Sequence, residues 1–280
     1  MAVKLIIDST ADMPQDLKGR CTVVPLTVCF GTREYTDGVD LDHKTFYEML
    51  IESDQLPSTS QATPAAFTRV LEALDPQDSA VILTLSSELS GTYQSAMMAA
   101  YDYPGRVFVV DSRSAAIGTG ILAELALTLI DSGLSAFEIA QALTKEREKI
   151  YVVALLDTLE YLKRGGRISK TVAFAGTMLS IKPVAAIRDG GIHILGKARG
   201  SRQGNNHLVQ EIQKAGGIDF DKPLLLGYTG LSDALLTKYV EDSKALWEHG
   251  TEHLRSTPIG SVIGTHAGPG AIAVAFFSKT

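Results

Sequence analysis

Four hydroxyl side chains gather at one point of the sequence, after an apolar segment and before a helix-forming one. They are Ser86, Ser87, Ser90 and Thr92. The apolar residues 80–85 predict a strand buried on both faces, and a helix is predicted to follow the hydroxyls. Hydroxyl donors, free N–H groups at a helix start and the helix dipole would together suit a carboxylate or a phosphate. The same serines could instead only cap the helix, and their spacing does not decide between the two interpretations.

A second hydroxyl-rich segment, residues 57–64, is predicted to be a loop that leads into another helix. Thr63 is placed to cap that helix and Pro64 to occupy its first position. Thr59 and Ser60 are not needed for the cap, so their hydroxyls are free to face a ligand. Ser and Thr are also ordinary loop residues, and that alternative stays open.

One histidine differs from the other five in its surroundings. His266 lies in the glycine-rich residues 264–270, which we predict to be a loop between strands at 257–263 and 271–277. The other histidines fall in segments predicted to be helix, hairpin or surface, where a solvated imidazole is the ordinary expectation. They are His43, His193, His207, His249 and His253.

Several enzyme and cofactor classes lack their sequence signals. Ser90 and His266 could meet an aspartate such as Asp8 in a serine hydrolase, but the GxSxG nucleophile elbow is missing. The HExxH and CxxC motifs and a P-loop are also missing, so we expect no metal and no cofactor. A GxGxxA pattern at 118–123 starts well after the preceding predicted strand, which favours close helix packing over dinucleotide binding.

The first 157 residues alternate predicted strands with predicted helices. Strands are predicted at 3–7, 80–85, 106–110 and 151–156, with a small β excursion near 23–38. Such alternation is typical of a parallel sheet with helices on both faces. Ligands bind at the carboxyl edge of these sheets, where the loops after Ile7, Leu85 and Val110 carry Asp, Ser and Thr.

Polar residues at the starts of other segments predict helix caps. Asp42 precedes a helix, and Ser135 with Glu138 forms a capping box. Asp8 and Asp12 are expected either to cap a helix that starts near residue 14 or to meet a ligand.

The pattern changes after residue 157. The turn residues 189–191 between two apolar runs predict a β-hairpin, and hence antiparallel pairing. Helices are predicted at 171–179, 202–215 and 232–248, and strands at 224–228, 257–263 and 271–277. We therefore predict an α/β fold of two domains with a ligand cleft between them. Residues 1–157 form the parallel domain, and residues 158–280 form an α+β domain with a largely antiparallel sheet.

Charge and composition argue against several partners. The chain of 280 residues has a net charge of −6 and no long basic run, so we expect no nucleic-acid surface. Its N-terminal apolar stretch is short for a signal peptide, and no apolar run reaches the ~18 residues of a membrane span. We therefore expect no stable membrane insertion.

Cys21 and Cys29 lack CxxC spacing and are predicted to be buried free thiols, which indicates a cytoplasmic protein.

Short segments along the whole chain resemble, in order, those of the DegV family of bacterial fatty-acid-binding proteins. They are DSTAD at 8–12, PLTV at 25–28, TSQ at 59–61, LSS at 85–87, LSGTY at 89–93, GGRIS at 165–169, KP at 182–183 and HAG at 266–268. The resemblance implies a two-domain DegV-like fold that holds a long-chain fatty acid, such as palmitate, with its tail buried between the domains.

The resemblance also implies which residues bind the fatty acid. The family's carboxylate contacts match Thr59, Ser90 and His266 in this sequence. A protonated imidazole beside the carboxylate would add an attractive charge. The supporting residues of the same loops are Ser60, Gly91 and Thr92.

A partner is implied as well. In the family, the carrier presents the carboxylate to a separate ATP-dependent fatty acid kinase, which forms an acyl-phosphate. By resemblance, Arg167 and Arg199 would meet that kinase or the transferred phosphate. We therefore expect a lipid carrier without catalytic activity of its own. The alternatives are a serine hydrolase that uses Ser90 and His266, and a protein that binds a phosphorylated ligand.

Overall fold

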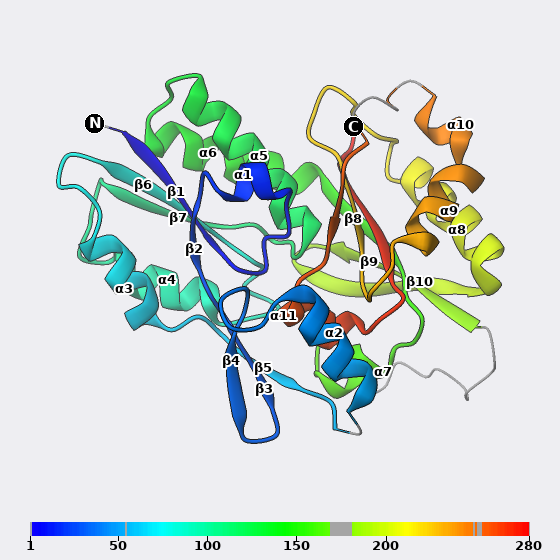
Figure 1. Cartoon of the computed structure of the whole chain (residues 1–280). Coiled ribbons are helices and arrows are strands. Elements are labelled where there is room, and N and C mark those ends of the chain that lie inside the picture. Colours follow the sequence, from blue (N-terminus) through cyan, green and yellow to red (C-terminus); the bar gives the residue numbers. More distant parts are fainter. Residues whose placement is uncertain (1, 54, 169–180, 249, 251–253, 280) are drawn as a thin grey trace.

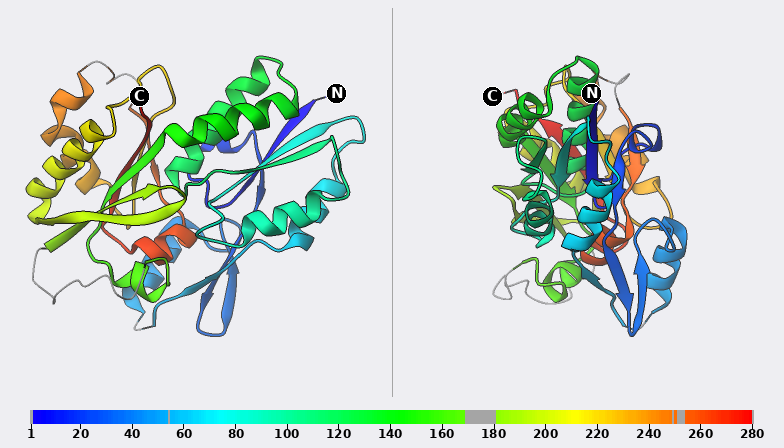
Figure 2. Two further views of the ribbon diagram at one scale, coloured as in Figure 1. Left: turned by 180° about the vertical axis from the view of Figure 1, so that it is seen from behind. Right: turned by 90° about the vertical axis from the view of Figure 1, so that its left-hand side faces the viewer.

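The structure is a computed structural model that describes residues 2–53, 55–168, 181–248, 250 and 254–279. The strands of these residues form one parallel sheet, one mostly antiparallel sheet and one small sheet. Figures 1 and 2 show the two larger sheets in separate halves of the molecule, with helix α5 (Ile117–Asp131) between them. The predicted fold class is confirmed.

The four-stranded sheet is parallel throughout, in the order β2-β1-β6-β7. Its strands are β1 (Val3–Asp8), β2 (Thr22–Val24), β6 (Ser79–Thr84) and β7 (Val107–Asp111). Its faces are covered by α3 (Pro64–Glu72) and α4 (Thr92–Ala100) on one side, and by α5 and α6 (Ala136–Glu146) on the other. Ile6 and Ile82 face the first pair of helices, whereas Ile7 and Leu83 face the second. Successive side chains of a strand alternate between faces, and both faces are buried, as the apolar runs predict.

The six-stranded sheet has the order β10-β9-β8-β13-β11-β12 and is antiparallel except for its last pair. Its strands are β8 (Ile150–Leu155), β9 (Ile181–Arg188), β10 (Gly191–Arg199), β11 (Leu225–Tyr228), β12 (Ser256–Pro258) and β13 (Ile272–Phe277). Its outer helices are α8 (Gly200–Lys214), α9 (Ala234–Asp242) and α10 (Lys244–Trp247). The predicted hairpin is confirmed: Asp189 and Gly190 both have positive φ, as a type I′ turn requires.

The β excursion is a separate antiparallel sheet in the order β4-β3-β5. Its strands are β3 (Thr27–Phe30), β4 (Arg33–Thr36) and β5 (Ser58–Ser60). Thr59 and Ser60 therefore lie in a strand, and their assignment to a loop was wrong. Cross-strand pairing of Thr59 with Val28 overrides the loop-like composition of the segment.

Helix α5 connects the two larger sheets. Its residues Ile117 and Ile121 belong to a core cluster that also contains Leu83 of the parallel sheet and Val152 of the antiparallel sheet. A Cβ added at Gly120 would lie only 2.0 Å from the carbonyl oxygen of Asp12. The glycines of the GxGxxA pattern therefore serve close packing, as predicted.

Some of the predicted helix caps are confirmed, and others are wrong. Asp42 caps α2 (His43–Glu52), Thr63 caps α3, and Ser135 forms a complete capping box. The expectation that Asp8 caps the next helix was wrong. Helix α1 (Gln15–Lys18) has no side-chain cap, and the carboxylate of Asp8 accepts hydrogen bonds from the backbone of the β1 and β6 loops.

Two element assignments in the second half of the chain were also wrong. Strand β8 pairs with β9 and β13, so it belongs to the antiparallel sheet instead of extending the parallel one. The segment 257–263 contributes only the short β12, and α11 (Ser261–Ala267) follows it. Its β-branched residues suggested a strand, but packing against α2 and α7 (Glu160–Arg164) stabilises a helix instead. The division into domains at residue 157 stays a prediction.

Other expectations concern single segments. The predicted helix at 232–248 is divided at Ser243 into α9 and α10. The predicted helix at 171–179 lies outside the described residues. Both cysteines are free thiols, as predicted, although they are half-buried. Among the helices that the structure describes, none combines the length and the apolar character that crossing a membrane requires.

Candidate functional site

Helix α11 and strand β5 bring together two of the predicted site residues. The Oγ1 atom of Thr59 and the Nε2 atom of His266 are 2.9 Å apart, although the residues are 207 positions apart in the sequence. His266 occupies the last turn of α11, so its placement in a glycine loop between strands was wrong. A helix fixes the imidazole more firmly than a loop would, because its backbone hydrogen bonds hold the ring's attachment point.

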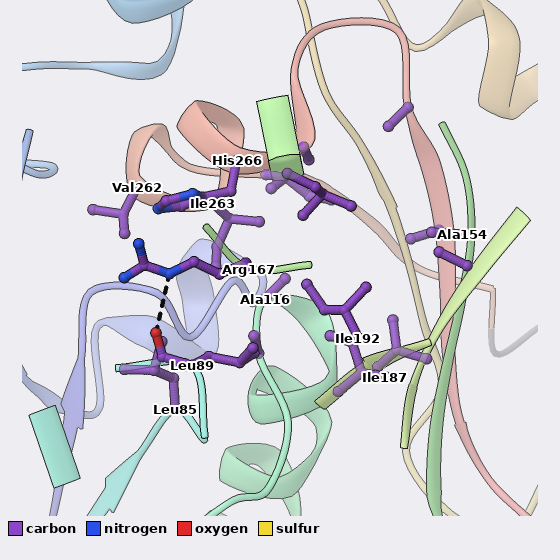
Figure 3. Close-up of a pocket in the computed structure, with 18 of the residues that line it drawn as sticks. Leu85, Leu89, Ala116, Ala154, Arg167, Ile187, Ile192, Val262, Ile263 and His266 are labelled. Atoms are coloured by element: carbon purple, nitrogen blue, oxygen red, sulfur yellow. Dashed lines mark hydrogen bonds between the residues drawn. The ribbon is translucent and has the colours of Figure 1, made fainter. Parts of the chain in front are cut away.

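These two residues lie at one end of a cavity between the two larger sheets. We call the end formed by Thr59, Ser90, Arg167 and His266 the polar end. Apart from Ser60, Gln61 and Thr229, the remaining lining is apolar and comes mainly from β8, β9, β10, β13, α11 and the loops after β6 and β7. Figure 3 shows the lining residues running from His266 and Arg167 towards Ile187, Ile192 and Ala154.

The serine cluster after β6 contributes less to the cavity than its sequence suggests. The Ser86 hydroxyl donates to the carbonyl oxygen of Gly190 at 2.7 Å, and the Ser87 hydroxyl donates to Asp111 at 2.6 Å. Ser90 is the member of the cluster that lines the cavity, and its hydroxyl lies 2.9 Å from that of the fully buried Thr92. The expected four-hydroxyl anion site is therefore reduced to one serine with a supporting threonine.

The supporting residues have structural partners. Gly91 precedes α4, and a Cβ added there would lie 2.0 Å from the side-chain oxygen of Gln61, so a larger residue would make the Gln61 side chain shift. Ser60 contributes to the cavity lining beside Thr59. Their part in binding stays a prediction.

His266 is neutral in this structure. Burial, together with the nearby guanidinium of Arg167, lowers the pKa of its imidazole to about 4. The Nδ1 atom is buried without a hydrogen-bond partner among the described residues and faces Gly165. An unprotonated Nδ1 leaves the proton on Nε2, which can then donate to Thr59. The protonated imidazole considered from the sequence depends on a carboxylate beside the ring and stays a prediction.

Arg167 supplies the positive charge at the polar end. Its Nε donates to the carbonyl oxygen of Leu89 at 3.2 Å (Figure 3), and its Nη1 donates to that of Gly165 at 2.6 Å. Burial lowers the pKa of the guanidinium, but an arginine stays charged. Arg199 lies elsewhere: it is exposed at the end of β10, and its backbone N–H donates to Gln203.

The residues of the hydrolase alternative do not form a triad. Ser90 pairs with Thr92 and His266 pairs with Thr59. Asp8 accepts hydrogen bonds from Thr10 and from the backbone N–H of Leu85. Each candidate member thus has a partner outside the proposed triad, which removes the geometry that serine activation needs.

Two acidic residues that sequence reasoning did not assign to the site hold α11 in place. Asp12 accepts a hydrogen bond at 3.0 Å from the backbone N–H of Gly260, and the Ser261 hydroxyl donates to Asp37. Both carboxylates are buried. Asp12 belongs to the DSTAD segment, which the sequence analysis had singled out. The contact of Asp12 with Gly260 spans 248 positions, however, and no local sequence pattern indicates it.

Comparison with protein families gives a match over nearly the whole chain. The model of a family described as "Uncharacterised protein, DegV family" matches residues 2–279. A DegV domain-containing protein of Caldanaerobacter subterraneus subsp. tengcongensis is 34% identical over 282 residues, which cover 99% of each chain.

Solved structures match the same extent of the chain. A structure described as fatty acid binding of a DegV family protein from Thermus thermophilus is 33% identical, with a TM-score of 0.88. It covers 99% of this chain and 100% of its own. A stearic acid-binding protein from Eubacterium ventriosum is 26% identical, with a TM-score of 0.86, and covers 100% of this chain and 99% of its own. These likenesses extend over both larger sheets and therefore include the elements that line the cavity.

Proposed function

Because the chain belongs to the DegV family, we propose that it binds a long-chain fatty acid in the cavity between its two larger sheets. The carboxylate lies at the polar end and the acyl tail lies among the apolar side chains. One observation carries this proposal: a single cavity combines hydroxyl, imidazole and guanidinium groups at one end with an almost wholly apolar lining beyond them. The relatives described as fatty acid binding support it.

The two ends of the cavity have different energetic roles. Burial of an acyl chain contributes about 0.8 kcal/mol per methylene, so a tail of about fifteen methylenes contributes on the order of 10 kcal/mol before ordering costs. A carboxylate loses solvation on entry and regains about 1.5–3 kcal/mol from each charge-assisted hydrogen bond. The tail therefore supplies most of the affinity, and the polar end fixes the orientation.

The polar end offers the carboxylate three donor groups, two hydroxyls and one guanidinium. The hydroxyl of Thr59 is free to donate to a ligand when Nε2 of His266 donates to its oxygen. Ser90 adds a second hydroxyl, and Arg167 adds a positive charge whose two carbonyl partners hold it beside the cavity. A carboxylate placed there would meet donors that are already oriented, which lowers the entropy cost of binding.

We further propose that the protein is a cytoplasmic carrier that presents the carboxylate to a separate ATP-dependent fatty acid kinase. The charge of Arg167 at the polar end suits a phosphate that is transferred to the carboxylate. Arg199 is exposed and outside the cavity lining, so its part in this proposal is contact with the kinase surface. The carrier itself performs no chemistry in this scheme.

The proposal predicts a bound lipid in protein purified under native conditions. Mass spectrometry of an organic extract should give about one fatty acid per chain, and an empty extract after gentle handling would contradict the proposal.

Ser90→Ala should weaken binding of an added fatty acid by about tenfold to a hundredfold, because one hydrogen bond to a charged group is lost. Isothermal titration of delipidated protein measures this loss.

The matched control for that variant is Ser87→Ala. Ser87 belongs to the same loop, but its hydroxyl bonds to Asp111 instead of lining the cavity. Binding by the control should equal that of the unaltered protein. Equal weakening in both variants would mean that Ser90 acts through the loop and not on the carboxylate.

A further inference from the structure

The antiparallel sheet presents rows of side chains to the cavity, and the rows differ in size. Strand register places Ala154 of β8 between Ala273 of β13 and Ala185 of β9. All three line the cavity, so this row leaves room above the sheet. The neighbouring row, two residues along each strand, consists of Val152, Ile187 and Ile192. Both rows share one face of the sheet, because side chains two residues apart on a strand point the same way. The second row has larger side chains on β8 and β9, where Val152 and Ile187 replace alanines.

Ile187 and Ile192 form a cross-strand pair on the β9–β10 hairpin, next to its turn. Both are half-buried and line the cavity. Figure 3 places them away from His266 and Arg167, with Ala116 between the two groups. A tail that starts at the polar end and extends through the cavity would therefore approach these two isoleucines with its methyl end.

The turn of the hairpin is held against the carboxyl edge of the parallel sheet. The buried Ser86 hydroxyl donates to the carbonyl oxygen of Gly190 at 2.7 Å. Gly190 has a φ of +83°, and a Cβ added there would lie 2.8 Å from Oγ of Ser86. Arg113 and Asp189 approach each other to 3.9 Å beside this contact. These contacts fix the hairpin tip, and with it the position of the two isoleucines.

We propose that Ile187 and Ile192 form the end wall of the acyl-tail cavity and set the longest fatty acid that the protein accepts. This inference rests on the proposed function and names the residues that determine chain-length specificity. Replacing one isoleucine by alanine removes three carbon atoms and makes room for about two further methylenes. Each additional methylene that becomes buried tightens binding by about fourfold.

The test is a competition for the cavity. Delipidated protein is incubated with an equimolar mixture of saturated fatty acids of increasing length, and the bound acids are measured by mass spectrometry. Ile187→Ala and Ile192→Ala should move the distribution towards longer acids, and the double variant should move it further. Ile192→Phe should move it towards shorter acids. Ile187→Val should give a smaller shift than Ile187→Ala. Because it removes less of the side chain, it still tests the inference if the alanine variant does not fold.

Ile194→Ala is the matched control. Ile194 is on the same strand as Ile192 and packs against the same apolar cluster, but it is not part of the cavity lining. Its truncation should leave the distribution unchanged. If the variants at Ile187 and Ile192 also leave it unchanged while the unaltered protein binds fatty acid, the end wall lies elsewhere and the inference is wrong. An unaltered protein that binds no fatty acid would instead overturn the proposed function itself.

Discussion

The imidazole of His266 is placed so that its charge state reports on the cavity. In the empty protein, burial and the charge of Arg167 lower its pKa to about 4. A fatty-acid carboxylate at the polar end would favour the protonated ring, because an opposite charge within a few ångströms raises the pKa of a histidine. We therefore predict that the His266 ring becomes more basic when a fatty acid binds.

Nuclear magnetic resonance titration tests this at the scale of a single residue. We expect the His266 ring of delipidated protein to stay neutral down to about pH 5 and its pKa to rise when a fatty acid binds. His266→Gln assigns the signal by removing it. A titration midpoint of the His266 ring above pH 6 in delipidated protein would contradict the assignment of the polar end. A pKa that stays the same when a fatty acid binds would also contradict it.

Residue types alone indicated the site only in part. Serines and threonines after β6 suggested an anion site, but Ser86 and Ser87 have structural partners. The pairing of Thr59 with His266 crosses 207 positions, and only the family resemblance placed both at one carboxylate. From the resemblance, Arg167 was expected to meet a kinase or the transferred phosphate, and this stays a prediction. Its place in the cavity lining follows from packing that no local pattern encodes.

At the scale of elements, α11 positions the polar end, and the parallel half of the molecule holds α11. Asp12 binds the backbone N–H of Gly260, and Asp37 binds the hydroxyl of Ser261. Burial is the main cause that raises the pKa of Asp12 to about 7, and the neighbouring carboxylates of Asp37 and Asp8 contribute to the rise. Lys18 and the Gly260 N–H act in the opposite direction. The start of α11 is therefore held by a carboxyl group that titrates near neutral pH.

This carboxyl predicts how stability depends on pH. A folded-state pKa above the unfolded value means that the folded protein binds more protons, so the free energy of unfolding falls as pH rises through 7. Between pH 6.5 and 8 the expected loss from Asp12 is about 0.8 kcal/mol. His266 acts in the opposite direction, but only below about pH 6.5, because its folded-state pKa is lowered. Asp12→Asn should remove this part of the slope in urea unfolding.

The test compares how steeply the free energy of unfolding changes with pH in the two proteins, and not its absolute value. Oδ2 of Asp12 is buried without a hydrogen-bond partner among the described residues, so the amide group that replaces the carboxyl changes stability at every pH. Asp8 is also buried with a raised pKa, so some slope should remain in the variant. The surface residue Asp131, which pairs with Arg20, provides the control through Asp131→Asn. Equal slopes in Asp12→Asn and the unaltered protein would mean that Asp12 titrates outside this window.

Elements with strong local signals were predictable, and those decided by distant contacts were not. The capping box at Ser135, the Asp189–Gly190 turn and the apolar run of β6 each carry their own pattern. Helix α11 carries β-branched residues, and its helical state depends on Asp12, Asp37 and neighbouring helices. Strand β8 looks like a parallel strand, because a strand buried on both faces gives the same apolar run in either sheet.

At the scale of the whole molecule, the two larger sheets share one core. The cluster around α5 includes Leu5 and Leu83 of the parallel sheet together with Val152 and Ala273 of the antiparallel sheet. A buried helix that packs against both sheets couples their unfolding, because neither sheet can lose its partner without exposing apolar surface. The cavity lies across the same division, since its lining comes from both halves of the chain.

Calorimetry of delipidated protein should therefore give one unfolding transition, and loading should move that whole transition upwards. A fatty acid at a hundred times its dissociation constant adds about 2.7 kcal/mol to the free energy of unfolding. The methyl ester of the same acid keeps the tail but loses the charge, so it should give a smaller shift at equal concentration. Two transitions, of which only one responds to the acid, would mean that the halves unfold independently and that the tail does not bridge them. A single transition that rises with the acid and less with the ester is the result expected of a lipid held by both sheets at once.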